Sequence, residues 1–101
     1  MKPDDARKKL EEYRVVIDEL DRRIVDLLNQ RTRVVEDIGR VKRSADLPIY
    51  EPRREDQVYE NISQAIADGP LTKEAVTRIF ERIIDEMRMV QRVRMATDGE
   101  K

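Results

Sequence analysis

Apolar residues recur every three or four positions along the first forty residues, which is the spacing of one face of an α-helix. The period is unbroken from an acidic start near Asp4 or Asp5 to Ser44, and it predicts a helix of roughly 38 residues. Arg31 alone interrupts this row of inward positions: Leu10, Tyr13, Ile17, Leu20, Ile24, Leu27, Arg31, Val34, Ile38 and Val41.

Two shorter helices are predicted after this long one. Pro48 and Pro52 bracket an extended linker, and Pro52 suits the first position of a helix that runs to about Ala67 and is ended by Asp68-Gly69-Pro70. Thr72 is the expected N-cap of a third helix, which runs to about Met95 and leaves a frayed tail from Thr97 to Lys101. The pattern therefore predicts an all-α fold of three helices in one domain, residues 1–101.

The two short helices are too short to cover the whole apolar face of the first. With only 101 residues, one chain offers a thin core. An economical solution is a homodimer in which two long helices pack along each other and the short helices of each chain complete the core of the other. The predicted assembly is an intertwined helical homodimer.

Composition narrows the possible chemistry. Charged residues make up 43% of the chain, and 21 Lys plus Arg nearly balance 22 Asp plus Glu, so no basic footprint for nucleic acid is expected. The sequence holds neither cysteine nor histidine, which disfavours disulfides, thiolate sites, zinc sites and catalytic triads. No apolar run has the length of a membrane span. We expect a cytoplasmic protein without membrane association, cofactor or metal.

Several polar residues fall on faces that should point inward. Lys42 follows Arg31 by three helical turns on nearly the same face, and Gln91 continues the apolar row of the third helix. Glu55 lies on the inner stripe of the second helix, beside Arg54. Because buried charge needs a partner, three cations against one carboxylate favour a small anion, one that itself carries carboxylates.

Each of these residues also has a purely structural interpretation. Arg31 could pair with an internal carboxylate, and Lys42 could extend its ammonium to solvent at a helix C-terminus. Arg54 and Glu55 could be solvated in a first turn, and Gln91 could be a buried amide that fixes helix register. The convergence of all five is what favours a ligand site.

Arg14 lies 17 residues before Arg31, which places it about 25 Å away along the helix and roughly 100° around it. It cannot enter the site of its own Arg31. In an antiparallel pair of long helices, it could enter the site of the partner chain.

Five segments stand out in a fixed order: residues 13–21, Asn29-Gln30-Arg31, Ile38-Gly39-Arg40-Val41-Lys42, Arg53-Arg54-Glu55 and residues 83–91. In these segments, and from about Leu10 to Gln91, the sequence resembles the all-helical (type II) bacterial chorismate mutases, which are intertwined dimers of three-helix chains. Each segment is short, but their joint order and spacing are specific.

The resemblance implies the Claisen rearrangement of chorismate to prephenate, in phenylalanine and tyrosine biosynthesis. This step needs a constrained substrate and well-placed charge but no covalent intermediate. By resemblance, Arg31 holds one carboxylate of the substrate, and Arg14 of the other chain holds the second. Lys42 and Gln91 donate to the ether oxygen, where negative charge grows, and Lys42 also contacts a carboxylate.

The resemblance also assigns the remaining positions. Glu55 accepts from the ring hydroxyl, assisted by the backbone around Glu51, and Arg54 supports the carboxylate side. Glu51 stands where a shorter aspartate is often found. Met87 stands where a serine can contact a carboxylate, and the loss of that donor should weaken substrate binding by about one hydrogen bond.

Two other functions stay open at this point. An isochorismate pyruvate lyase shares the fold and several of the cations, although the Arg54-Glu55 pair favours the mutase. A non-enzymatic helical dimerisation or regulatory module would need every inward cation to be satisfied by protein carboxylates. The sequence also leaves open whether the chain is free-standing or part of a bifunctional enzyme, and it says nothing of regulation, rate or partner enzymes.

Overall fold

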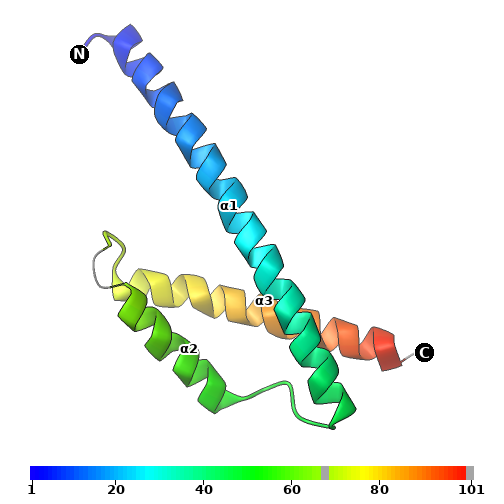
Figure 1. Cartoon of the computed structure of the whole chain (residues 1–101). Coiled ribbons are helices and arrows are strands. Elements are labelled where there is room, and N and C mark those ends of the chain that lie inside the picture. The colour runs from blue at the N-terminus through cyan, green and yellow to red at the C-terminus, as the bar shows by residue number, and fades with distance from the viewer. Residues whose placement is uncertain (67–68, 100–101) are drawn as a thin grey trace. The chain divides into compact units, whose positions relative to one another are not determined.

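Three helices make up the secondary structure of the described chain: α1 (Pro3–Ser44), α2 (Pro52–Ala65) and α3 (Lys73–Gly99), as Figure 1 shows. The structure, a computed structural model, describes residues 1–66 and 69–99, with side chains as far as residue 94. The predicted all-α class, with one very long helix before two shorter ones, is confirmed.

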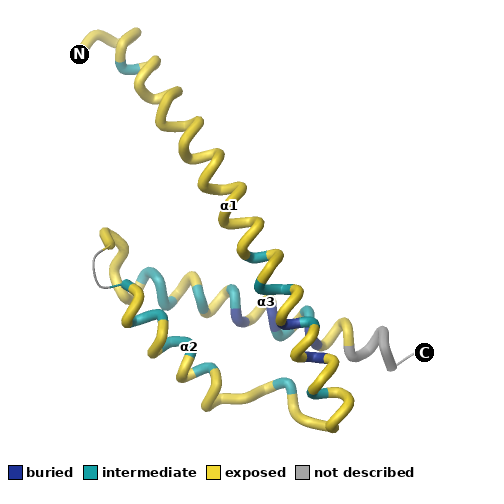
Figure 2. The backbone as a smooth tube through the Cα atoms, viewed as in Figure 1, coloured by how far each residue is buried: buried dark blue, intermediate teal, exposed yellow. Residues whose placement is uncertain are grey.

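The chain divides into two compact units, residues 1–33 and residues 34–101, which we describe separately. The first unit consists of the N-terminal part of α1, which starts at Pro3, slightly earlier than expected, with Asp4 and Asp5 in its first turn. Carboxylates there favour the positive end of the helix dipole. The predicted apolar row is present but uncovered (Figure 2): its members are 43% to 62% exposed, namely Leu10, Tyr13, Ile17, Leu20, Ile24 and Leu27.

The second unit begins within α1, whose C-terminus is closed by backbone hydrogen bonds. Asp46 adopts a left-handed conformation with φ 54°, and its N–H donates to the carbonyl of Arg43 at 3.2 Å. The N–H of Leu47 donates to the carbonyl of Lys42 at 2.7 Å. These two bonds form a Schellman motif, which satisfies the last carbonyls of the helix and turns the chain into the linker.

The bounds of α2 agree with the prediction at its start. Pro52 opens the helix, because a proline lacks the N–H that would have no acceptor in the first turn. Glu51 is the N-cap, but its side chain makes no capping bond. The helix ends at Ala65 with Ile66 as its C-cap. The end predicted at Ala67, and Asp68 of the predicted stop, lie outside the described residues.

The third helix begins as predicted but extends further. The hydroxyl of Thr72 accepts a hydrogen bond from the N–H of Ala75 at 3.1 Å, which confirms the N-cap. We expected the helix to end near Met95 with a frayed tail from Thr97, and this was wrong for the backbone, which is helical to Gly99. No proline or glycine stands between Lys73 and Asp98, so nothing interrupts the backbone hydrogen bonds earlier. Residues 100 and 101 of the predicted tail lie outside the described residues.

The core of the second unit is small and lies on α3. Its buried side chains are Val35 of α1 and Ile84, Met87 and Gln91 of α3, and Gly39 is buried beside them. The helix α2 packs along α3, with the inner residues of α2 half-buried. Figure 2 shows the buried positions gathered where the end of α1 meets α3. This junction holds Gln91, one of the polar residues that the sequence pointed to.

Candidate functional site

The eight predicted site residues are divided between the two units. Arg14 and Arg31 belong to the first unit. The other six lie in the second unit: Lys42 at the end of α1, Glu51 in the linker, Arg54 and Glu55 in α2, and Met87 and Gln91 in α3.

Among the side chains that the structure describes, Gln91 is the buried polar one, with 7% of its surface exposed. Its amide nitrogen donates to the carbonyl of Val35 on α1 at 3.3 Å. Gly39, one turn further along α1, faces the same side chain: a β-carbon there would lie 3.5 Å from Cγ of Gln91, which is an ordinary contact. Because a primary amide carries two donors, the bond to Val35 leaves capacity for one more acceptor.

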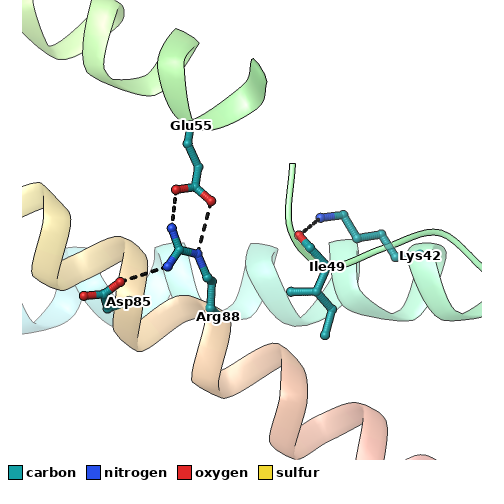
Figure 3. A network of polar contacts seen from close by, with 5 residues as sticks. All are labelled: Lys42, Ile49, Glu55, Asp85 and Arg88. Atoms are coloured by element: carbon teal, nitrogen blue, oxygen red, sulfur yellow. Dashed lines mark hydrogen bonds and ion pairs between the residues drawn. The ribbon is translucent and has the colours of Figure 1, made fainter. Parts of the chain in front are cut away.

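Lys42 points inward, as helical phase predicted. Its side chain is only 11% exposed, and its ammonium donates to the carbonyl of Ile49 at 2.8 Å, as Figure 3 shows. The same nitrogen lies 2.8 Å from a carboxylate oxygen of Glu51. An ammonium has three donors, so these two contacts leave capacity for a third. The side chain therefore fastens the linker and keeps a cation at the end of α1.

Glu55 is half-buried on the inner side of α2 and binds Arg88 of α3 through both carboxylate oxygens (Figure 3). Nε of Arg88 donates to Oε2 at 3.1 Å, and Nη2 donates to Oε1. This hydrogen bonding to Glu55 raises the pKa of Arg88 above its ordinary value. Arg88 also donates to Asp85 at 3.0 Å and lies against the ring of Tyr50, 5.4 Å from its centre.

Sequence reasoning missed Arg88. A signal was available, since Arg88 follows the inward Ile84 by four residues and therefore shares its side of the helix. Its partner Glu55 is 33 residues away, however, and no local pattern connects the two.

The half-buried charges Lys42, Glu55 and Arg88 of the second unit each have a partner of opposite charge within the chain. Lys42 faces Glu51, and Arg88 faces Glu55. The surplus of buried cations that we inferred from the sequence is therefore absent among these four residues. Unpaired positive charge among these residues does not indicate an anionic ligand, whereas the unused donors of Lys42 and Gln91 leave room for one.

Arg54 and Met87 differ in their surroundings. Arg54 is exposed on α2, and its guanidinium contacts Gln57 at 3.5 Å, the outer limit of a hydrogen bond. Met87 is 9% exposed and belongs to the apolar core. In the first unit, Arg31 is half-buried, whereas Arg14 is exposed and pairs with Glu11 at 2.7 Å.

Other kinds of site are not built by the residues that the structure describes. Within them, no three His, Cys, Asp or Glu side chains are grouped so that they could hold a metal ion. Among the helices of the same residues, none is both long and apolar enough to cross a membrane.

An apolar cavity lies between the C-terminal end of α2 and the start of α3, apart from the polar residues described above. Its lining contains none of the predicted site residues and consists of Ile62, Ala65, Ile66, Gly69, Pro70, Leu71, Val76 and Phe80.

Comparison with known proteins identifies the relatives of this chain. It is 33% identical over 98 residues to a bifunctional chorismate mutase/prephenate dehydratase of Aquifex aeolicus, covering 93% of this chain and 27% of that protein. It thus spans about a quarter of the length of that relative. It is 28% identical to a chorismate mutase of Methanocaldococcus jannaschii, covering 84% of this chain and 86% of that protein.

A solved structure agrees with these sequence relatives. The fold is similar to form II chorismate mutase of Thermus thermophilus, with a TM-score of 0.79 and 28% identity, over 83% of this chain and 94% of that one. Residues 13–92 match the family described as chorismate mutase type II. The chain therefore belongs to the chorismate mutase type II family.

Proposed function

We propose that this chain is a chorismate mutase that converts chorismate to prephenate. The observation that carries the proposal is the family match over residues 13–92, supported by a relative named chorismate mutase that this chain matches over most of both lengths. The reaction conserves all atoms: one carbon–carbon bond forms while the ether C–O bond breaks. It therefore requires no redox partner and no proton transfer.

Lys42 and Gln91 are the groups that lower the barrier in this proposal. Negative charge grows on the ether oxygen as the C–O bond breaks, and donors already held in place stabilise it without reorganisation. Both side chains are inward and anchored by one hydrogen bond to a backbone carbonyl, Lys42 to Ile49 and Gln91 to Val35. Each keeps the capacity for a further acceptor, and this supports their role as donors.

The two carboxylates of chorismate are bound by arginines in this proposal. Arg31 binds one carboxylate from within its own chain, and Arg14 binds the other from a second copy. Guanidinium groups suit this task because their planar donors match a carboxylate. Arg54 supports the carboxylate side, and Met87 leaves one polar contact fewer than a serine would provide.

A homodimer completes the proposed site. The exposed apolar row of α1 supports this assembly, because six large apolar side chains on one helix face are costly to leave in water. A second copy of α1 offers a row of the same kind. The uncovered apolar cavity between α2 and α3 adds to the surface that a partner could bury.

Glu55 accepts a hydrogen bond from the ring hydroxyl of chorismate, and the backbone around Glu51 assists. A carboxylate is a suitable acceptor because its oxygens carry about four lone-pair positions, of which Arg88 uses two.

The cytoplasmic location inferred from composition stays a prediction.

Adding chorismate to the purified protein tests the function directly. We expect the absorbance of chorismate to fall and prephenate to be the product. Release of pyruvate from isochorismate would instead support the lyase, and the absence of both reactions would support a structural module.

Lys42→Ala tests the proposed role of the ammonium, with Arg40→Ala as a matched control. Arg40 lies on the same helix, is 54% exposed and pairs with Asp37, three residues before it. We expect Lys42→Ala to lower turnover by roughly a hundredfold or more, the size expected for one donor to a developing anion. Arg40→Ala should leave turnover near the wild-type value, and equal losses in both variants would contradict the role of Lys42.

A further inference from the structure

Arg88 is held on three sides in the second unit, and Figure 3 draws two of these contacts, those with Glu55 and Asp85. Its guanidinium donates to both oxygens of Glu55 on α2 and to the carboxylate of Asp85 on its own helix. Its planar group also lies against the ring of Tyr50 in the linker. These contacts join three segments of the chain through one side chain.

The contact with Glu55 fixes the orientation of that carboxylate. A single hydrogen bond would leave the group free to rotate, whereas two parallel bonds to one planar fork define both its position and its plane. The pair is also partly shielded from water, with side chains 28% exposed for Arg88 and 20% for Glu55. Solvent therefore weakens this pair less than the surface pairs of the same chain.

The fork leaves Glu55 able to bind something else. Each carboxylate oxygen has two lone pairs, and Arg88 uses one on each, so the outer positions are open to another donor. Arg88 also lies three residues before Gln91 on α3. One rigid helix therefore fixes the position of the buried Gln91 amide and, through Arg88, the orientation of the Glu55 carboxylate.

We propose that Arg88 is the positioning residue for Glu55: it holds the carboxylate in the plane in which Glu55 accepts the substrate hydroxyl. Arg88 itself does not touch the substrate. This inference rests on the proposed function, because the acceptor role of Glu55 belongs to the mutase reaction.

A double-mutant cycle tests the inference. Arg88→Gln should lower kcat/KM for chorismate by roughly ten- to a hundredfold, the range for one charge-assisted hydrogen bond. Glu55→Gln should also lower kcat/KM, and the double variant should be no worse than the poorer single variant, since Arg88 acts through Glu55. Arg88→Lys should recover only part of the loss, because an ammonium keeps the charge but not the fork.

Arg82→Gln is the matched control. Arg82 lies on the same helix and pairs with Glu86 at 2.8 Å, but its side chain is 76% exposed. Its variant should keep wild-type kinetics. Additive losses in the cycle, or equal kinetics in Arg88→Gln and Arg82→Gln, would overturn the positioning role while other site variants still establish the mutase.

A measurement independent of activity separates this inference from the proposed function. The Nε resonance of Arg88 in a nitrogen-15 NMR spectrum should move strongly in Glu55→Gln and little in Glu86→Gln. An unmoved resonance would overturn the pair itself. A wild-type protein that leaves chorismate unchanged, with the resonance moving as expected, would refute the proposed function and with it the positioning role.

If Arg88→Gln fails to fold, Asp85→Asn provides a second variant. It removes one anchor of the guanidinium without touching Glu55, and it should lower kcat/KM by a few-fold. Unchanged kinetics would then overturn the inference.

Discussion

The amide nitrogen of Gln91 donates to the carbonyl of Val35 at 3.3 Å, which joins α3 to α1 through a buried side chain. Gln91→Ala should therefore have two separable effects. Turnover should fall strongly, because the proposed donor to the ether oxygen is lost. The free energy of unfolding should fall by about 1–3 kcal/mol, because one hydrogen bond is lost and a small cavity is left.

Circular dichroism, the mass of the assembly and chorismate turnover should be measured on the same Gln91→Ala preparation. Helicity and mass should match the wild type. Near-normal turnover in a folded variant would exclude Gln91 from the chemistry.

Gly39 should tolerate substitution by alanine but not by the larger valine. A β-carbon there would meet Cγ of Gln91 at 3.5 Å, an ordinary contact, and alanine is favoured over glycine in helices by about 0.5–1 kcal/mol. Gly39→Ala should therefore be slightly more stable than the wild type in urea. Gly39→Val should lose both stability and turnover, because a branched side chain must displace Gln91. The reverse order of stabilities would show that space is not limiting at this position.

Asp46 adopts a left-handed conformation that glycine adopts at no cost in strain. The free energy gained by relieving this strain exceeds the cost of the extra conformational entropy that glycine gives the unfolded chain. Asp46→Gly should therefore raise the free energy of unfolding by about 0.5–1 kcal/mol. Asp46→Ala, which keeps a β-carbon but loses the polar group, should be less stable than Asp46→Gly. Both should be compared by urea unfolding at one protein concentration. Equal midpoints would show that the turn carries no strain.

Burial is the main cause that raises the pKa of Tyr59 above its ordinary value of 10.0, and the carboxylates of Glu81, Glu55 and Asp85 add to it against the opposing effect of Arg88. The folded state thus keeps this phenol neutral when the unfolded chain already ionises. Its contribution to stability is fully present below pH 10.0 and is lost as pH rises from there through the higher folded pKa.

Tyr59→Phe should therefore lose less stability than the wild type above pH 10, because it has no phenol to ionise. The difference between the two proteins in the free energy of unfolding should be constant from about pH 7 to pH 9 and should change only above that range. A constant difference throughout would show that Tyr59 does not contribute to the alkaline loss.

Arg14→Ala and Arg31→Ala should each have low activity alone, since each lacks one carboxylate ligand in both proposed sites. After the two variants are mixed and allowed to exchange chains, half of the proposed dimers should be hybrids with one intact site. About a quarter of wild-type activity should then return. A mixture that stays inactive while mass spectrometry detects hybrid dimers would show that the two arginines do not act across chains.

The helices were predictable because their signals are local. The apolar period shows which segments are helical. Pro52 marks the start of α2 and the Thr72 cap marks the start of α3, and the structure agrees with both. The end of α3 was misplaced, since no residue before Gly99 marks a stop. Family membership was also predictable, because it depends on the order of several short segments.

The pairing of charges was not predictable from the sequence. Helical phase shows that Lys42 and Glu55 face inward, but it cannot show which opposite charge meets them. The partner of Glu55 comes from another helix, and that of Lys42 comes through a bend of the linker. Such pairs depend on tertiary geometry at the scale of single rotamers, and this is why Arg88 was overlooked.

The contact of Lys42 with Ile49 has a consequence for the length of the linker. Four contacts close the chain between Lys42 and Glu51 into a small ring. The Schellman turn joins position 46 to 43 and position 47 to 42, and the ammonium of Lys42 contacts positions 49 and 51. Adding or deleting a residue inside this ring would move either the bend or the ammonium. The number of residues between α1 and α2 is therefore constrained by the position of the Lys42 ammonium as well as by the need to connect two helices.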